Sequence, residues 1–132
     1  MIFVDTSFWV ALVAARDDHH RESRGLLERH AEEHLVTTNQ VRGEAWTFIR
    51  RRYGHRPAVM LLDALRDSPR ISVSFVTEDL EEQALRWLRR RDERVYSFVD
   101  AGSFAFMRSI KAARALTFDD EFEAAGFQVM RL

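Results

Sequence analysis

The sequence predicts a three-layer α/β domain with a central, mainly parallel sheet, formed by residues 1–132 as a single unit. Short apolar segments alternate along the chain with longer amphipathic segments, as in successive strand–helix–strand units. The chain holds only two prolines and no Gly/Ser-rich stretch that would mark a linker. At 132 residues, with 46% hydrophobic side chains, it is long enough to bury one substantial core.

The first half of the chain predicts two strands and four helices. Residues 2–4 form an apolar run that ends at an acid, which is typical of a buried strand. Residues 6–15 are apolar on nearly every face, whereas residues 21–33 are amphipathic, with Leu26, Leu27 and Ala31 expected to face inward. A second strand is expected at 35–37. Helices are then expected at 39–53, with Asn39 as its N-cap, and at 57–67, with Pro57 in its first turn.

The second half continues the alternation. Residues 71–76 alternate and are rich in β-branched side chains, which predicts a third strand. The remaining elements are expected as helices at 78–91, 100–110 and 119–125 and strands at 115–118 and 127–130. Strands that alternate with helices join by right-handed crossovers, so both faces of the sheet should be covered.

Composition excludes several classes of protein. The net charge of −1 differs from the bulk positive charge of a protein that coats nucleic acid. The absence of cysteine excludes disulfides, thiolate zinc sites and a thiol nucleophile. No apolar run approaches the ~20 residues of a membrane helix, and the first residues lack a basic segment typical of a signal peptide. We therefore expect a cytoplasmic protein without a membrane partner.

Four carboxylates fall where such sheets place their ligand sites, beyond the carboxyl ends of the strands. Asp5 follows the first expected strand, Asp119 follows the fourth, and Asp100 opens a helix. Glu44 lies in the middle of a helix between Val41 and Phe48, so its side chain is expected on the apolar face. Each aspartate could instead serve as a helix cap, but a mid-helix glutamate caps nothing.

Converging carboxylates favour a bound cation, because like charges raise one another's pKa. Oxygen ligands without cysteine favour a hard ion such as Mg²⁺ or Mn²⁺. Such a cluster suits hydrolysis of phosphodiesters, in which the ion acidifies a water and neutralises charge on phosphate oxygens. Thr6, Ser7 and Ser103 are candidates to support the acids through their hydroxyl groups.

Four segments, in order along the chain, resemble the successive motifs of a PIN domain and, more narrowly, of the VapC toxins of bacterial toxin–antitoxin pairs. The segments are residues 2–7 (IFVDTS), 38–44 (TNQVRGE), 96–101 (YSFVDA) and 116–119 (LTFD). The resemblance implies a PIN-like α/β/α fold and a Mg²⁺- or Mn²⁺-dependent endoribonuclease whose metal-binding, catalytic acids match Asp5, Glu44, Asp100 and Asp119. It also implies a homodimer and a cognate antitoxin protein. Because Asp120 follows Asp119 directly, either could be the last ligand.

If the substrate is RNA, two arginine clusters become candidate contacts for its phosphate groups. Arg50, Arg51 and Arg52 form one cluster, and Arg89, Arg90 and Arg91 form another; both are candidate RNA contacts, although charge runs on helices are often simply solvated. Trp9, Trp46 and Tyr96 are candidate stacking platforms for an unpaired base. The expected substrate is a structured RNA, either tRNA or ribosomal RNA, and we expect no direct reading of DNA by this chain.

Three alternatives stay open at the level of sequence. Residues 30–34 (HAEEH) match the H-x-x-E-H pattern of zinc peptidases, which would need both imidazoles on one face of a helix. A Mg²⁺-binding receiver-like domain has a similar size and layering, but it needs paired acids after the first strand, where Asp5 is followed by Thr6 and Ser7. A non-enzymatic α/β interaction domain would bind no metal at all.

Overall fold

A computed structural model describes all residues from Met1 to Leu132, and it confirms the three-layer α/β/α architecture. Its five-stranded sheet has the order β3-β2-β1-β4-β5, and every neighbouring pair is parallel. The strands are β1 (Ile2–Val4), β2 (Leu35–Thr38), β3 (Ile71–Ser74), β4 (Arg114–Leu116) and β5 (Gln128–Val129). The helices are α1 (Thr6–Val13), α2 (His20–Arg29), α3 (Asn39–Arg52), α4 (His55–Asp67), α5 (Glu78–Arg90), α6 (Phe98–Ser109) and α7 (Glu121–Ala124).

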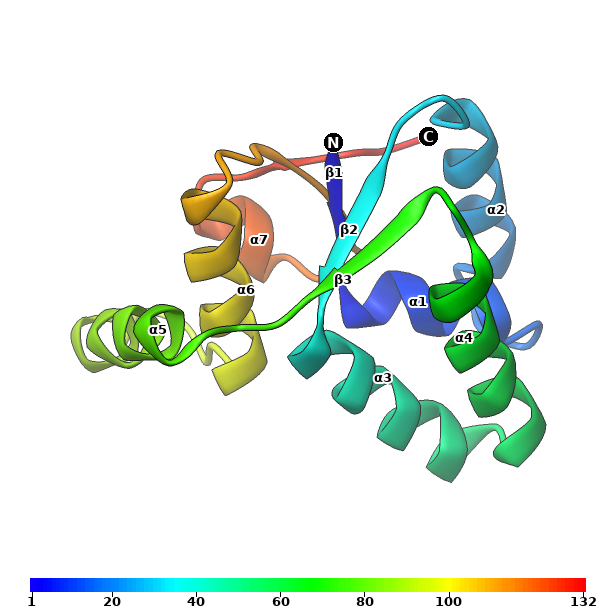
Figure 1. Ribbon diagram of the computed structural model, residues 1–132, viewed down its shortest axis with the longest axis horizontal. Helices are drawn as coiled ribbons and strands as arrows, with labels where there is room; N and C mark the ends of the chain where they lie inside the picture. Colours follow the sequence, from blue (N-terminus) through cyan, green and yellow to red (C-terminus); the bar gives the residue numbers. More distant parts are fainter.

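The strand order places β1 at the centre and makes the chain change direction there. From β1 the chain moves outward through β2 to β3, and it then returns to the other side of β1 for β4 and β5. Right-handed crossovers therefore put α1–α4 on one side of the sheet and α5–α7 on the other, as Figure 1 shows. The point between β1 and β4 is where parallel α/β sheets open a crevice beyond the strand ends.

The core is continuous across the sheet. Phe3 of β1 packs on Phe106 of α6 and Phe122 of α7, with ring centroids 6.1 and 5.9 Å apart. Helix α6 is the most enclosed helix, since each residue from 101 to 107 is buried. None of the helices is both long and apolar enough to cross a bilayer.

Several boundaries differ from the predicted ones, and hydrogen bonds explain them. Helix α2 ends at Arg29 rather than near residue 33, because the Arg70 guanidinium donates to the carbonyl oxygens of Leu27, His30 and Glu33. Ala31 lies beyond the helix and is exposed, so the prediction that it faces inward was wrong.

The start of α3 also differs. Thr38, not Asn39, is the N-cap: its hydroxyl accepts a hydrogen bond from the Val41 amide at 3.2 Å. Asn39 instead uses its Oδ1 to accept from the Val76 amide at 2.8 Å, which ties the loop after β3 to the first turn of α3. Strand β3 accordingly ends at Ser74 rather than at residue 76.

Candidate active site

Asp5 lies at the centre of the candidate site, between the carboxyl ends of β1 and β4. The residue is 1% exposed and stands at the N-cap position of α1, yet its side chain makes no capping hydrogen bond. Its Oδ2 instead accepts from the Thr117 hydroxyl at 3.0 Å and from the Ser7 hydroxyl at 3.3 Å. The capping alternative for Asp5 is therefore wrong, and the carboxyl is held by hydroxyl groups from the first turn of α1 and from the residue after β4.

The surroundings of Asp5 disfavour its negative charge. Burial, and then the charges of Asp119 and Asp100, together raise the pKa of this carboxyl from 3.8 to about 8. Hydrogen bonds from the Thr6 amide and the Thr117 hydroxyl act in the opposite direction and are outweighed. In the absence of a cation, Asp5 is thus mostly protonated at neutral pH.

Among the charged neighbours of Asp5, Asp119 raises its pKa the most. Burial raises the pKa of Asp119, while a hydrogen bond with the Asp5 carboxyl lowers it, so the two carboxyl groups are adjacent. The residue as a whole is exposed, but its carboxyl faces the crowded interior of the site. The loop that carries it is fixed by the Ser7 and Thr117 hydroxyls, which accept from the amides of Phe118 at 2.9 Å and of Asp119 at 3.0 Å.

The conformation of this loop determines whether Asp119 or Asp120 lies beside Asp5. Strand β4 ends at Leu116, two residues earlier than predicted, so Asp119 follows a short turn rather than the strand itself. Asp120 occupies the N-cap position of α7, and Glu121 pairs with Arg94 at 3.2 Å. Of the three acids, the structure brings Asp119 to Asp5.

Asp100 approaches from α6. The helix begins at Phe98, so the prediction that Asp100 opens it was wrong by two residues; Ser97 is the N-cap, and Asp100 is the third helical residue of a capping box. Its Oδ2 accepts from the Ser97 amide at 3.1 Å, and its own amide donates to the Ser97 hydroxyl at 2.9 Å. Burial raises the pKa of Asp100, and the charges of Asp119 and Glu44 raise it further.

Glu44 reaches the site from a position that the sequence analysis misjudged. Val41, Ala45 and Ile49 form the buried face of α3, whereas Glu44 is exposed, so its predicted place on the apolar face was wrong. Its carboxylate is directed to the site by the Thr6 hydroxyl, which donates to Oε1 at 2.5 Å. Glu44 is therefore a rim acid whose orientation depends on Thr6.

Hydroxyl groups organise the site more than the sequence analysis anticipated. Ser7 and Thr117 lie 3.2 Å apart through their hydroxyl oxygens, and both contact Asp5. Thr117 is 3% exposed and was missed; the signal that pointed to it is a hydroxyl side chain two residues before an acid at a strand end. Ser103 is buried on α6, but its hydroxyl has no hydrogen-bond partner and touches none of the acids.

The four acids have the ligand atoms that suit a divalent cation, but their side chains are not arranged around one point as a preformed metal site. Four carboxylates from four segments supply oxygen ligands alone, and the charges of neighbouring acids raise the pKa of Asp5 and of Asp100, so a cation among them would be favoured. No three acidic or histidine side chains surround one point at ligand distance as they stand. Their oxygens are held instead by Thr117, Thr6 and Ser97, and binding would require small rotations of the side chains.

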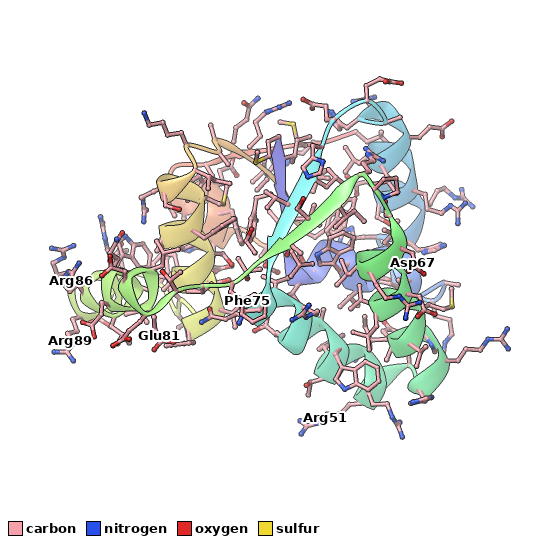
Figure 2. The ribbon with its side chains drawn as sticks, viewed as in Figure 1. Arg51, Asp67, Phe75, Glu81, Arg86 and Arg89 are labelled. Atoms are coloured by element: carbon pink, nitrogen blue, oxygen red, sulfur yellow. The ribbon has the colours of Figure 1, made fainter.

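A groove leads away from the acids along α3. A cavity of about 440 Å³ is lined by Thr6, Ser7, His19, Glu44 and Asp119, among others. A wider one of about 910 Å³ shares Glu44 with it and continues to Arg51 and Arg52. Arg50 is exposed but lines neither cavity, and Figure 2 shows Arg51 near the far end of α3.

The second arginine cluster lies elsewhere. Arg89, Arg90 and Arg91 are at the end of α5, on the opposite side of the molecule from α4. Arg90 and Arg91 line a separate cavity with residues of α6, whereas Arg89 does not. Figure 2 shows Arg86 and Arg89 at the outer end of this helix.

Two other candidates take structural roles. The zinc-motif alternative is wrong, because residues 30–34 follow the end of α2 instead of lying on a helix. Glu33 binds the Arg114 guanidinium through two contacts of 2.6 and 2.7 Å, and His34 contacts the Ser72 hydroxyl at 2.7 Å. Trp9 is 1% exposed and therefore unavailable for stacking on a base. Trp46 and Tyr96 are half-buried.

Comparison with known proteins agrees with this fold. The family model described as the PIN domain matches residues 2–128, so the chain belongs to the PIN-domain family. Within that family it groups with the VapC toxins. It is 51% identical over 131 residues to the 23S rRNA-specific endonuclease VapC20 of Mycobacterium tuberculosis, and the match covers 99% of this chain and 98% of the relative.

Solved structures agree as well. The crystal structure of M. tuberculosis VapC20, described as a sarcin–ricin loop cleaving toxin, superposes with a TM-score of 0.94 at 50% identity over 100% of both chains. VapBC2 of Rickettsia felis, solved with a DNA fragment of its promoter, superposes with a TM-score of 0.72 over 98% of both chains. At 14% identity, the second likeness is one of fold alone.

Proposed function

We propose that this chain is a Mg²⁺- or Mn²⁺-dependent endoribonuclease, the toxin of a toxin–antitoxin pair, and that it cuts 23S ribosomal RNA at the sarcin–ricin loop. The observation that carries the proposal is the approach of Asp5, Glu44, Asp100 and Asp119 from four segments to the β1/β4 crevice. The identity of 51% to VapC20 over almost the whole chain supports ribosomal RNA rather than tRNA as the substrate. We further propose that the protein works in the cytoplasm as a homodimer, reads no DNA itself and is inhibited by a cognate antitoxin.

In this proposal the four acids hold the cation, with Asp119 rather than Asp120 as the fourth. The bound ion would supply positive charge for the phosphate oxygens and a more acidic water for attack. The residues of the chain then do the positioning. Ser7 and Thr117 fix the Asp5 carboxyl, and Thr6 orients Glu44 at the rim.

Arg51 and Arg52 are placed to guide the RNA strand toward these acids. Both line the groove that also contains Glu44, and an arginine fork binds phosphate oxygens in pairs. Arg50 is on the same helix without lining the groove, so it provides a matched control. We expect Arg51→Gln with Arg52→Gln to raise KM for the RNA on the order of tenfold, and Arg50→Gln to change it little.

The test of the proposed function is cleavage of purified 23S rRNA and of 50S ribosomal subunits with Mg²⁺ or Mn²⁺, with new 5′ ends mapped by sequencing. We expect one discrete new 5′ end within the sarcin–ricin loop. This end should be absent when EDTA is added and when Asp100→Asn replaces the unchanged protein. Asp92→Asn, at an exposed position in the loop before α6, is the matched control and should cut normally. An end that persists in Asp100→Asn, or no end on either substrate, would contradict the proposal. The latter would favour the non-enzymatic alternative.

A further inference from the structure

A third cavity, of about 350 Å³, lies between α5 and α6 and is lined by four arginines. Arg86, Arg90 and Arg91 contribute from the α5 side and Arg108 from α6. Gln83 and Trp87 complete the polar and aromatic parts of the lining. The alanines at 101 and 105, with their small side chains, leave the space open on the α6 side.

The positive charge in this cavity is largely uncompensated. No aspartate or glutamate lines it, and Arg86, Arg90 and Arg108 form no ion pair. Arg91 approaches Glu93 at 3.5 Å, with about half of each side chain exposed, so that contact is weak. Burial lowers the pKa of Arg108, and the positive charge of Arg91 lowers it further.

Two of the four guanidinium groups are held in place by the same aromatic ring. Arg91 lies over the Trp87 indole at 5.4 Å and Arg108 lies over it at 5.8 Å; Arg108 also lies over Phe127 at 5.5 Å. Trp87 itself is fixed against Phe104, with ring centroids 5.3 Å apart. Groups that are already ordered lose less side-chain entropy when they bind a ligand.

Stabilisation of the helix explains only part of this cluster. Acids in the first turn of α5 and Arg89 and Arg90 in its last turn complement the helix dipole. That effect fades within one turn, so it does not account for Arg86. It also does not account for Arg108, which enters the same cavity from another helix. Convergence from two helices without an acid is characteristic of a site for an anion.

We propose that this α5–α6 arginine pocket binds phosphate groups of the RNA substrate, on the strand that flanks the cut. The inference rests on the proposed ribonuclease function. Helix α6 carries both sites, since Asp100 is in its first turn and Arg108 is eight residues further on, about 12 Å along the helix axis. At 3.4 Å per stacked nucleotide, that spacing corresponds to three or four nucleotides of one strand.

The experiment measures equilibrium binding of the full chain in EDTA, which prevents cleavage, to two RNAs at a series of salt concentrations. One RNA is the sarcin–ricin stem-loop with about 20 base pairs of stem, and the other is a fragment of about four nucleotides centred on the cut, which is too short to reach a pocket three or four nucleotides away. The test variant is Arg86→Gln with Arg90→Gln. The matched control is Arg21→Gln with Arg24→Gln, which removes the same charge from exposed positions outside the pocket.

For the long RNA, we expect the test variant to weaken binding on the order of tenfold and to reduce the slope of log Kd against log salt by about 1 to 2, with each phosphate contact contributing 0.7 to 0.9. The control and the short RNA should show little change. If the test variant does not fold, Arg90→Gln compared with Arg24→Gln gives the same test with one charge removed.

The other outcomes are distinct. If the slopes of log Kd against log salt are equal for the test variant and the control while the unchanged protein still cleaves RNA, the pocket does not bind RNA. The proposed function would not be affected by that result. Failure of the unchanged protein to bind or cut any RNA would overturn both. A third outcome is that the unchanged protein binds inorganic phosphate with a sub-millimolar Kd, that the test variant loses this binding, and that RNA binding does not depend on RNA length. This outcome would identify a small-anion site and refute the RNA contact.

Discussion

Replacing Asp5 by asparagine is expected to stabilise the metal-free protein even though it removes the central acid of the site. The Asp5 carboxyl is buried and accepts hydrogen bonds from Ser7 and Thr117. An asparagine can accept the same two bonds through its amide oxygen, and it carries no charge to bury. The Asp5 side chain therefore destabilises the folded state only because its buried carboxyl group can ionise.

The size of the effect follows from the pKa of about 8 in the folded state against 3.8 for the free group. Below pH 3.8 the carboxyl is protonated in both states, so it contributes no pH dependence. Between pH 3.8 and 8 the unfolded chain has lost this proton and the native one keeps it, so stability falls as pH rises. One pKa unit corresponds to ~1.4 kcal/mol; the cost is thus about 4 kcal/mol at pH 7 and on the order of 6 kcal/mol above pH 8.

Urea unfolding in EDTA at pH 5, 7 and 8.5 measures this directly. Asp5→Asn should be more stable than the unchanged protein, by an amount that grows with pH. Asp92→Asn, at an exposed position, should show no such trend. A destabilised Asp5→Asn at pH 8.5, or a difference that does not grow with pH, would refute the argument that the carboxyl is held neutral by its surroundings.

Other predictions concern the same site and the helices behind it. Mn²⁺ should raise the thermal midpoint more at pH 7.5 than at pH 5.5, because the acids must lose protons to bind it, and differential scanning calorimetry measures this. Thr6→Val should lower kcat for RNA cleavage about tenfold with little loss of stability, since it frees Glu44 from its 2.5 Å hydrogen bond; equal kcat would contradict the orienting role. Gly102→Ala should change the free energy of unfolding by less than about 1 kcal/mol in denaturant titrations, because the gain of about 1 kcal/mol from alanine in a helix offsets the cost of moving the end of the flexible Gln40 side chain away from the new methyl group.

The order of the elements could be predicted because strand and helix periodicities differ along this chain. All five strands and seven helices lie where apolar runs and amphipathic segments indicate them, and the parallel sheet follows from their alternation. Asp5 and Asp119 were found for the same reason, since parallel strands bring their carboxyl ends to one edge.

What the sequence could not provide are contacts between residues far apart in the chain. The early end of α2 depends on Arg70, which lies about 40 residues beyond it. The place of Glu44 on the exposed face depends on which side of α3 packs against the core, and the spacing of Val41 and Phe48 left that open. Thr117 became visible only when its hydroxyl was found beside Asp5, 112 residues away in sequence.

The return of the chain across β1 divides the four acids between two consecutive stretches of sequence. Residues 1–76 carry Asp5 and Glu44, and residues 77–132 carry Asp100 and Asp119; the two stretches meet where β1 pairs with β4. The link between them passes the exposed Phe75. A polypeptide divided at this link would give two inert fragments, each with half of the cluster. Fused to a pair of inducible dimerisation modules, the fragments would make a toxin whose production is harmless until the two are brought together.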